Sequence, residues 1–286
     1  MISFKRLDYY KQLMRLDKPI GILLLLWPTL WALWLAAKGT PDSIILWVFI
    51  LGTVLMRSAG CVINDYADQD FDAHVERTKN RPLATRVVSS KEALLLATGL
   101  SFCAFLLILN LNSLTISLSI CALFLAASYP FTKRFFAIPQ AYLGIAFSFG
   151  IPMAFAAQTN AIPVIAWLLM AANLLWVIAY DTEYAIVDKT DDLKIGIKTS
   201  AITFGRFDVA WIMLCHIIFI GLMFCVGQLQ SLGVAYYLSL SIALGLIMYQ
   251  YYLIRDRKPA DCFKAFLHNN WVGAIIFIGI ALDYFI

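Results

Sequence analysis

The sequence predicts an all-α fold, a polytopic membrane helix bundle of nine transmembrane helices around a central cavity. Of the 286 residues, 62% are hydrophobic and only 14% are charged. The mean hydropathy of +0.79 lies outside the range of soluble domains. The apolar residues also fall into long runs, most of which approach the length of about 17 to 25 residues that spans the hydrocarbon core of a bilayer.

The nine predicted spans lie near residues 20–37, 44–63, 92–109, 114–130, 138–157, 162–180, 208–226, 232–252 and 268–285. The first span follows five basic residues, but it contains Pro28 and no convincing cleavage site, so it is predicted to be an anchor and not a removable signal. The segment before it carries apolar residues at helical spacing, which is typical of an amphipathic helix at a lipid surface. The third and fourth spans form a hairpin because their connection is short. We expect residues 1–286 to form a single domain.

Lysine and arginine residues are distributed unevenly between the two sides of the predicted bundle. When the nine spans are assigned alternately, 20 of the 22 Lys and Arg residues fall on the side of the amino terminus, and Lys38 alone falls on the other side. By the positive-inside rule the basic side is cytoplasmic. The sequence therefore predicts a multi-pass protein of a bacterial inner membrane, with a cytoplasmic amino terminus and a carboxyl terminus on the opposite side.

An acidic stretch, NDYADQDFD at residues 64–72, lies where the second span leaves the membrane. At about 100° per residue on a helix, Asn64, Asp65, Asp68 and Asp72 share an arc of roughly 100°, while Asp70 points to the far side. Like charges this close need cations among them, and oxygen-only clusters suit Mg²⁺ that is held partly by a substrate phosphate. A phosphate ester bridged by a metal is the first hypothesis.

A second acidic stretch ends the sixth span with Asp181, Asp188, Asp191 and Asp192. Both stretches contain D-x6-D and D-x3-D, spacings that stack carboxylates on successive turns of a helix. One such stretch alone is equally well explained as a solvated helix end. Two of them, both on the predicted cytoplasmic face, indicate a shared site at one mouth of the bundle.

Basic residues accompany both acidic stretches. Arg57 lies seven residues before Asn64, on the same helix face and about 10 Å deeper in the membrane, where a charged side chain marks a functional site by default. The remaining candidates lie in the segments that face the cytoplasm, where they are placed to clamp a phosphate: Arg15, Arg77, Arg81, Lys133, Arg134, Lys194 and Lys198. Several of them are also explained as charges that only set the orientation of the chain in the membrane.

These motifs resemble those of the UbiA-type intramembrane prenyltransferases. Residues 64–72 match the N-D-x-x-D-x-x-x-D of that family, and Asp188 and Asp192 match its second D-x-x-x-D. The strings RLDKPIG, NDYADQDFDAHVERTKNRPL, YPFTKRFFAIPQ and YDTEYAIVDKTDDLKIGIKT are similar to those of the 4-hydroxybenzoate polyprenyltransferases of ubiquinone biosynthesis. The resemblance covers essentially the whole chain.

The resemblance implies a long allylic polyprenyl diphosphate as donor and 4-hydroxybenzoate as acceptor, joined at the ring carbon ortho to the hydroxyl. It implies Mg²⁺ as cofactor, with Asp68, Asp72, Asp188 and Asp192 as the catalytic carboxylates and with Asn64, Asp65 and Asp181 as further metal ligands. The expected diphosphate-binding residues are Arg15, Arg77, Arg81, Lys133, Lys194 and Lys198. Arg57 and Arg134 are the candidates for the acceptor carboxylate. Besides the lipid bilayer, we expect no nucleic-acid partner and no obligate protein partner.

Three alternatives remain open at this point. The first is another UbiA branch, of the menaquinone or haem O type, which the acidic motifs do not separate from the quinone branch. The second is a CDP-alcohol phosphotransferase, although neither acidic stretch contains the D-G or A-R of such enzymes. The third is a cation-coupled transporter, whose acidic residues are expected near the membrane midplane and not at the helix ends.

Overall fold

The computed structural model describes residues 4–286, and all regular secondary structure within them is helical. The elements are α1 (Phe4–Leu13), α2 (Ile20–Ala36), α3 (Ser43–Asp72), α4 (Ser90–Ile108), α5 (Ser113–Thr132), α6 (Pro139–Ser148), α7 (Gly150–Thr159), α8 (Val164–Ile195), α9 (Ser200–Phe204), the 3₁₀ turn η1 (Gly205–Phe207), α10 (Asp208–Leu229), α11 (Val234–Ile254) and α12 (Pro259–Phe285). The chain is therefore a polytopic, all-α membrane protein, as the sequence predicts.

Each predicted span coincides with apolar helix. Over residues 4–286, eight helical segments are long and apolar enough to cross a membrane, and α2 is a shorter apolar helix of 17 residues. The predicted count of nine therefore includes one helix that falls short on length. The α2 helix is short because Pro19 precedes it and because Lys38 and Gly39, both with positive φ, end it in a turn.

The span predicted at 138–157 is divided in two. The α6 helix ends at Ser148 and α7 begins at Gly150. Pro152 has no N–H with which to bond the carbonyl of Ser148, so the helical ladder is interrupted at this point. The break lies beside the cavity, because Phe149 and Gly150 both line it.

The α8 helix is the central element, and it packs against α6, α10 and α12. Its Trp176 lies between Trp31 of α2 and Phe219 of α10, with ring centroids at 5.3 Å and 5.7 Å. The three rings are fully buried. This aromatic core joins α2, α8 and α10 at the middle of α8.

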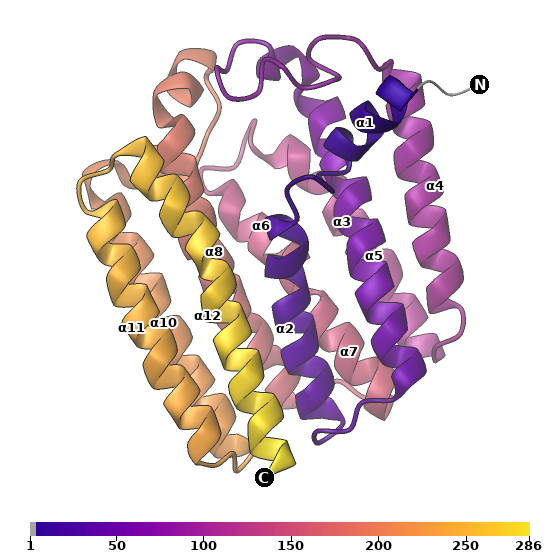
Figure 1. The fold of residues 1–286 in the computed structure, drawn as a ribbon, viewed down its shortest axis with the longest axis vertical. Coiled ribbons are helices and arrows are strands. Elements are labelled where there is room, and N and C mark those ends of the chain that lie inside the picture. The colour runs from indigo at the N-terminus through magenta and orange to yellow at the C-terminus, as the bar shows by residue number, and fades with distance from the viewer. Residues whose placement is uncertain (1–3) are drawn as a thin grey trace.

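The acidic stretches form the last turns of the two longest helices, α3 and α8, which are 30 and 32 residues long. Gly196, with φ of +72°, ends α8 just beyond its acidic residues, a conformation that favours glycine. The connection from α3 to α4 folds back over the bundle because Thr78 Oγ1 donates to the carbonyl of Asp72 at 2.9 Å. In Figure 1 this connection crosses the upper end of the bundle beside α1, and the carboxyl terminus lies at the lower end.

Candidate active site

A cavity of about 1550 Å³ lies between α2, α3, α5, α6, α7, α8 and the first turns of α12. Its lining includes every residue that the sequence analysis nominated for the metal and four of the six nominated for the diphosphate: Asn64, Asp65, Asp68, Asp72, Asp181, Asp188, Asp192, Arg15, Arg77, Arg81 and Lys133. Two acidic stretches more than 100 residues apart in sequence thus face one space.

The acidic face of α3 is arranged as its helical spacing predicts. Asp68 accepts a hydrogen bond from the Lys133 ammonium at 2.8 Å and from the Asn64 amide at 3.2 Å. Asp70 points away from the cavity, with a side chain that is 76% exposed and is 3.4 Å from Arg86. The prediction that Asp70 lies on the opposite face is therefore confirmed.

Asp65 and Asp72 share one arginine. The Arg81 guanidinium donates to Asp65 at 3.0 Å and to Asp72 at 2.8 Å through the same Nη1. Arg15, which follows α1, adds two hydrogen bonds to Asp65 at 2.8 Å and 2.9 Å. Both carboxylates are buried, so these cations supply the compensating charge that burial of an acid requires.

The acidic face of α8 is only partly neutralised. Arg77 donates to both carboxylate oxygens of Asp188, with its Nε at 3.0 Å, and its guanidinium lies 4.6 Å from the ring centroid of Tyr184. Asp181 and Asp192 form no ion pair with any lysine or arginine of residues 4–286. Two carboxylates in the cavity lining are thus left with free acceptor capacity.

The cations between the two acidic faces remain charged at physiological pH. Burial lowers the pKa of the Lys133 ammonium, but the nearby carboxylate of Asp68 raises it, and the net pKa is above the ordinary value. Burial likewise lowers the pKa of Arg81, and the charges of Asp65 and Asp72 raise it above its ordinary value. The mouth of the cavity therefore carries positive charges that are paired with carboxylates. Such a site can exchange these pairs for a phosphate and a cation.

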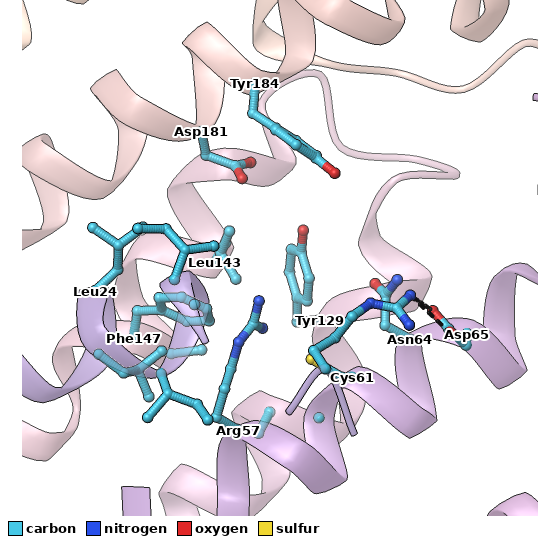
Figure 2. Close-up of a pocket in the computed structure, with 18 of the residues that line it drawn as sticks. Leu24, Arg57, Cys61, Asn64, Asp65, Tyr129, Leu143, Phe147, Asp181 and Tyr184 are labelled. Atoms are coloured by element: carbon cyan, nitrogen blue, oxygen red, sulfur yellow. Dashed lines mark hydrogen bonds and ion pairs between the residues drawn. The ribbon is translucent and has the colours of Figure 1, made fainter. Parts of the chain in front are cut away.

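Deeper in the cavity, Arg57 is the one cation of the described lining that lies inside the bundle. Its Nε is buried without a hydrogen-bond partner, and its guanidinium lies 5.2 Å from the ring centroid of Phe147. A Cβ at Gly21 would come within 2.6 Å of this guanidinium, so glycine is required there for the close approach. Figure 2 shows Arg57, Tyr129 and Asp181 directed toward the same space. This region can bind a small anion with an aromatic body.

Three nominated residues lie outside the cavity lining, and for them the sequence interpretation is corrected. Arg134 donates to the carbonyl of Ala67 at 3.1 Å and is exposed. Lys194 is 73% exposed and pairs with Asp191, while Lys198 donates to a backbone carbonyl. Lys133 and Arg134 are adjacent at the end of α5, and of the two only Lys133 lines the cavity.

Aromatic residues of the lining were missed by the sequence analysis. Tyr129 of α5, Tyr180 and Tyr184 of α8 and Phe263 of α12 all face the cavity. The helical spacing from Asp181 and Asp188 contains a usable signal, because Tyr184 lies between them on nearly the same face. Phe263 gave no such signal, since no acidic motif lies near it in the sequence.

The last predicted spans also contribute to a buried polar network behind the cavity. Asn269 donates to Glu183 at 2.8 Å and accepts from the Trp176 indole at 2.8 Å. His216 lies 3.6 Å from Glu183. All four side chains are buried. Two of the last three predicted spans, α10 and α12, thus supply polar side chains that contact α8 inside the bundle.

The candidate metal-binding atoms suit a hard divalent cation. The nominated ligands are carboxylate and amide oxygens, which Mg²⁺ and Ca²⁺ prefer, and Asp181 and Asp192 have unused acceptor capacity. Within residues 4–286, no three acidic, His or Cys side chains are grouped closely enough to hold a metal by themselves. The residues present therefore fit an ion whose coordination is completed by a bound phosphate, and not one caged by protein alone.

The sequence matches the UbiA prenyltransferase family over residues 25–273. It is 73% identical over 286 residues to the 4-hydroxybenzoate octaprenyltransferase of Nitrosospira multiformis, covering 100% of this chain and 99% of the relative. It is 70% identical over 278 residues to the protein of the same name from Nitrosomonas europaea, covering 97% of this chain and 95% of the relative.

Solved structures show the same architecture. The apo form of a UbiA homologue from Aeropyrum pernix K1 superposes with a TM-score of 0.80 at 26% identity, covering 92% of this chain and 97% of that one. A UbiA homologue from Archaeoglobus fulgidus bound to GPP and Mg²⁺ gives a TM-score of 0.72 at 17% identity, covering 94% of this chain and 99% of that one.

Proposed function

Since the chain belongs to the UbiA prenyltransferase family, we propose that it transfers a polyprenyl group from an allylic polyprenyl diphosphate to 4-hydroxybenzoate. The new bond forms at the ring carbon ortho to the hydroxyl, and diphosphate is released. This is a step of ubiquinone biosynthesis. We take residues 1–286 as one prenyltransferase domain.

One observation carries this proposal. Acidic and basic side chains line one end of a single cavity, and an arginine without a hydrogen-bond partner lies among aromatic residues in its interior. The charged end suits a diphosphate with its metal, and the interior suits an aromatic acid. A diphosphate donor at the charged end and an aromatic acceptor in the interior can therefore meet between the two regions.

At the charged end, Arg77, Arg81 and Lys133 are proposed to exchange their carboxylate partners for diphosphate oxygens. Arg15, in the segment that follows α1, is proposed to exchange its partner Asp65 in the same way. The carboxylates that are released, together with Asp181 and Asp192, would hold Mg²⁺, the ion that accompanies GPP in the Archaeoglobus fulgidus homologue. When bound, Mg²⁺ neutralises the charge of the leaving group. The arginine and lysine side chains stabilise the charge that develops as the allylic C–O bond breaks.

In the interior, the side chains receive the acceptor and exclude water. We assign the acceptor carboxylate to Arg57, whose planar guanidinium offers a two-pronged fork. Tyr129, Phe147 and Tyr180 present aromatic faces that stabilise an allylic carbocation, and an apolar lining limits its capture by water. The ring carbon bonds to this carbocation and then loses its proton, which restores aromaticity.

The three alternative functions have less support. The relatives that match over nearly the whole chain at 62% to 73% identity are named 4-hydroxybenzoate octaprenyltransferases, which favours the quinone branch over the menaquinone and haem O branches. A CDP-alcohol phosphotransferase is disfavoured by the family match. A transporter is disfavoured because most of the acids, Asp68 and Asp72 of α3 and Asp188 and Asp192 of α8, lie within the last two turns of their helices.

We propose that the protein lies in a bacterial inner membrane, with the amino terminus and both acidic stretches in the cytoplasm. The distribution of lysine and arginine supports this orientation, and α1 and the carboxyl terminus lie at opposite ends of the bundle (Figure 1). Reporter fusions after Lys38, Lys91 and Ile286 are expected to read outside, inside and outside. An inside reading at Ile286 would contradict the orientation.

The proposed reaction is tested by adding 4-hydroxybenzoate, a polyprenyl diphosphate and Mg²⁺ to membranes that contain the protein. A prenylated 4-hydroxybenzoate is expected, and chelation of divalent cations should abolish it because the diphosphate would leave without charge compensation. Membranes without the protein are the control. Product that forms equally well in excess chelator would contradict the role assigned to the acidic stretches.

A further inference from the structure

Lys189 lies at the edge of the acidic face of α8 but does not pair with it. At 100° per residue, its side chain leaves the helix about 100° from Asp188 and about 60° from Asp192. A lysine and an acid three residues apart on a helix are neighbours that can pair, and Lys194 and Asp191 of the same helix do so at 3.0 Å. Lys189 has another partner, and it is not part of the cavity lining.

The partner of Lys189 is Asp208, the first residue of α10. The ammonium donates to Asp208 Oδ2 at 2.9 Å and to the carbonyl of Gly205 at 3.1 Å. The other carboxylate oxygen, Oδ1, accepts from Nε of Arg257 at 2.8 Å, and this guanidinium also donates to the carbonyl of Arg206 at 2.8 Å. Asp208 therefore holds cations from two other segments, α8 and the connection between α11 and α12.

Asp208 is fully buried, so Lys189 and Arg257 supply the charge that a buried carboxylate requires. Its place in the first turn of α10 adds the favourable field of a helix amino terminus. That field explains an acid at this position, but it does not explain why a lysine from the acidic end of α8 pairs with it. The position of the Lys189 ammonium is therefore set by the Asp208 carboxylate.

Asp192 lacks a cation partner in this arrangement. Its carboxylate is buried and lines the cavity, and it forms no ion pair with a lysine or arginine of the described chain, residues 4–286. The other three carboxylates proposed as catalytic, Asp68, Asp72 and Asp188, each have one. Lys189 is the only lysine or arginine that lies three or four residues from Asp192 in the sequence.

We propose that Asp208 is a positioning residue, which holds Lys189 away from Asp192 and so leaves that carboxylate free to bind the divalent cation. The inference rests on the proposed function, which assigns the metal to the acidic stretches. It gives a role in metal binding to a residue outside the cavity. Without Asp208, the ammonium of Lys189 competes with the metal for Asp192, three residues along the helix.

Three variants separate this role from a purely structural one: Asp208→Asn, Lys189→Met and the double variant. Asp208→Asn removes the charge that holds Lys189, so the Mg²⁺ concentration for half-maximal binding should rise by about tenfold, as for one added charge-assisted hydrogen bond. Lys189→Met and the double variant lack the competing ammonium, and both should stay within about twofold of the unaltered protein. Arg255→Met is the control, because Arg255 is 51% exposed and lies in the same connection as Arg257.

Mg²⁺ binding is measured without catalysis, as the rise in melting temperature in detergent at a fixed concentration of inorganic diphosphate. Turnover supplies a second readout, because excess Mg²⁺ should displace the ammonium and restore the kcat of Asp208→Asn. A structural role would instead lower kcat at every Mg²⁺ concentration, and loss of Lys189 would add to the damage. Equal Mg²⁺ requirements in Asp208→Asn and the double variant would overturn the proposal.

A measurement on the unaltered protein tests the proposal even if Asp208→Asn does not fold. The side chains of Lys133 and Lys189 are similarly exposed, at 22% and 24%, but only Lys133 is proposed to exchange its carboxylate for diphosphate. Excess Mg²⁺ and inorganic diphosphate should therefore slow the acylation of Lys133 by an amine-reactive reagent by about fivefold or more and leave Lys189 unprotected, as determined by mass spectrometry of the peptides.

Equal protection of the two lysines would overturn the proposal and leave the proposed function standing. If Mg²⁺ and diphosphate change neither the melting temperature of the unaltered protein nor the labelling of Lys133, the proposed metal site fails, and this inference fails with it.

Discussion

Asp192→Asn should lower kcat by about 100-fold or more, as expected when a charge that stabilises the leaving group is removed. Asp192 is the clearest position for this test because its buried carboxylate holds no lysine or arginine within residues 4–286. Its replacement therefore leaves no cation unpaired. Asp68→Ala, Asp72→Ala and Asp188→Ala should be as damaging, but each of them also removes a carboxylate partner from a lysine or arginine.

Asp70→Ala is the matched control for these variants. Asp70 belongs to the same acidic stretch, but its side chain is 76% exposed and points away from the cavity. Its replacement should leave kcat within about twofold of the unaltered protein, because exposed ion pairs contribute little. Turnover should be measured at saturating Mg²⁺ and both substrates, on protein with an unchanged melting temperature in detergent. If Asp70→Ala is as damaging as Asp68→Ala, the assignment of a catalytic face to α3 fails.

Arg57→Ala should raise the KM for 4-hydroxybenzoate by about 100-fold or more, since an unpaired buried carboxylate costs several kcal/mol. The KM for the polyprenyl diphosphate should change far less, because the diphosphate is assigned to the cations at the mouth of the cavity. Arg57→Lys should rescue binding only in part, since lysine keeps the charge and loses the two-pronged fork.

Arg134→Ala is the control for this prediction. On sequence alone Arg134 was the preferred candidate for the acceptor carboxylate, ahead of Arg57, but it lies outside the cavity lining and is exposed. Its KM for 4-hydroxybenzoate should stay near that of the unaltered protein. Kinetics in which one substrate is varied at a time will distinguish the two arginines. A defect of Arg57→Ala confined to the diphosphate would show that the arginine had been assigned to the wrong substrate.

Helical periodicity explains how much of the fold and site could be predicted. Nine apolar ranges fall on helices because a bilayer leaves few other ways to satisfy backbone groups. The same 100° step per residue separates Asp70 from Asp68 and Asp72, and the structure has this arrangement. The acidic ends of α3 and α8 were predicted to lie at the same end of the bundle. That prediction required only the order of the spans in the chain and the alternation of their direction across the membrane.

The positions of the basic residues after each acidic stretch depend on tertiary packing, which the sequence pattern does not reveal. The segment after α3 is held by the Thr78 hydroxyl and by the buried Leu83, and this brings Arg77 and Arg81 over the cavity. Lys194 instead lies on the exposed side of α8, where it pairs with Asp191. The two lysines after Asp192 looked equivalent to the arginines after Asp72 because charge and spacing carry no information about how a connection folds back.

The transfer of a prenyl group to the ring of 4-hydroxybenzoate is most directly tested by identifying the products that the purified protein forms in lipid vesicles. With 4-hydroxybenzoate, octaprenyl diphosphate and Mg²⁺, diphosphate and prenylated acceptor should form in equal amounts, and the prenyl group should be bonded to the ring carbon ortho to the hydroxyl. Mass spectrometry and proton NMR of the product determine both. Diphosphate released without prenylated acceptor, or a prenyl group attached to oxygen, would contradict the account.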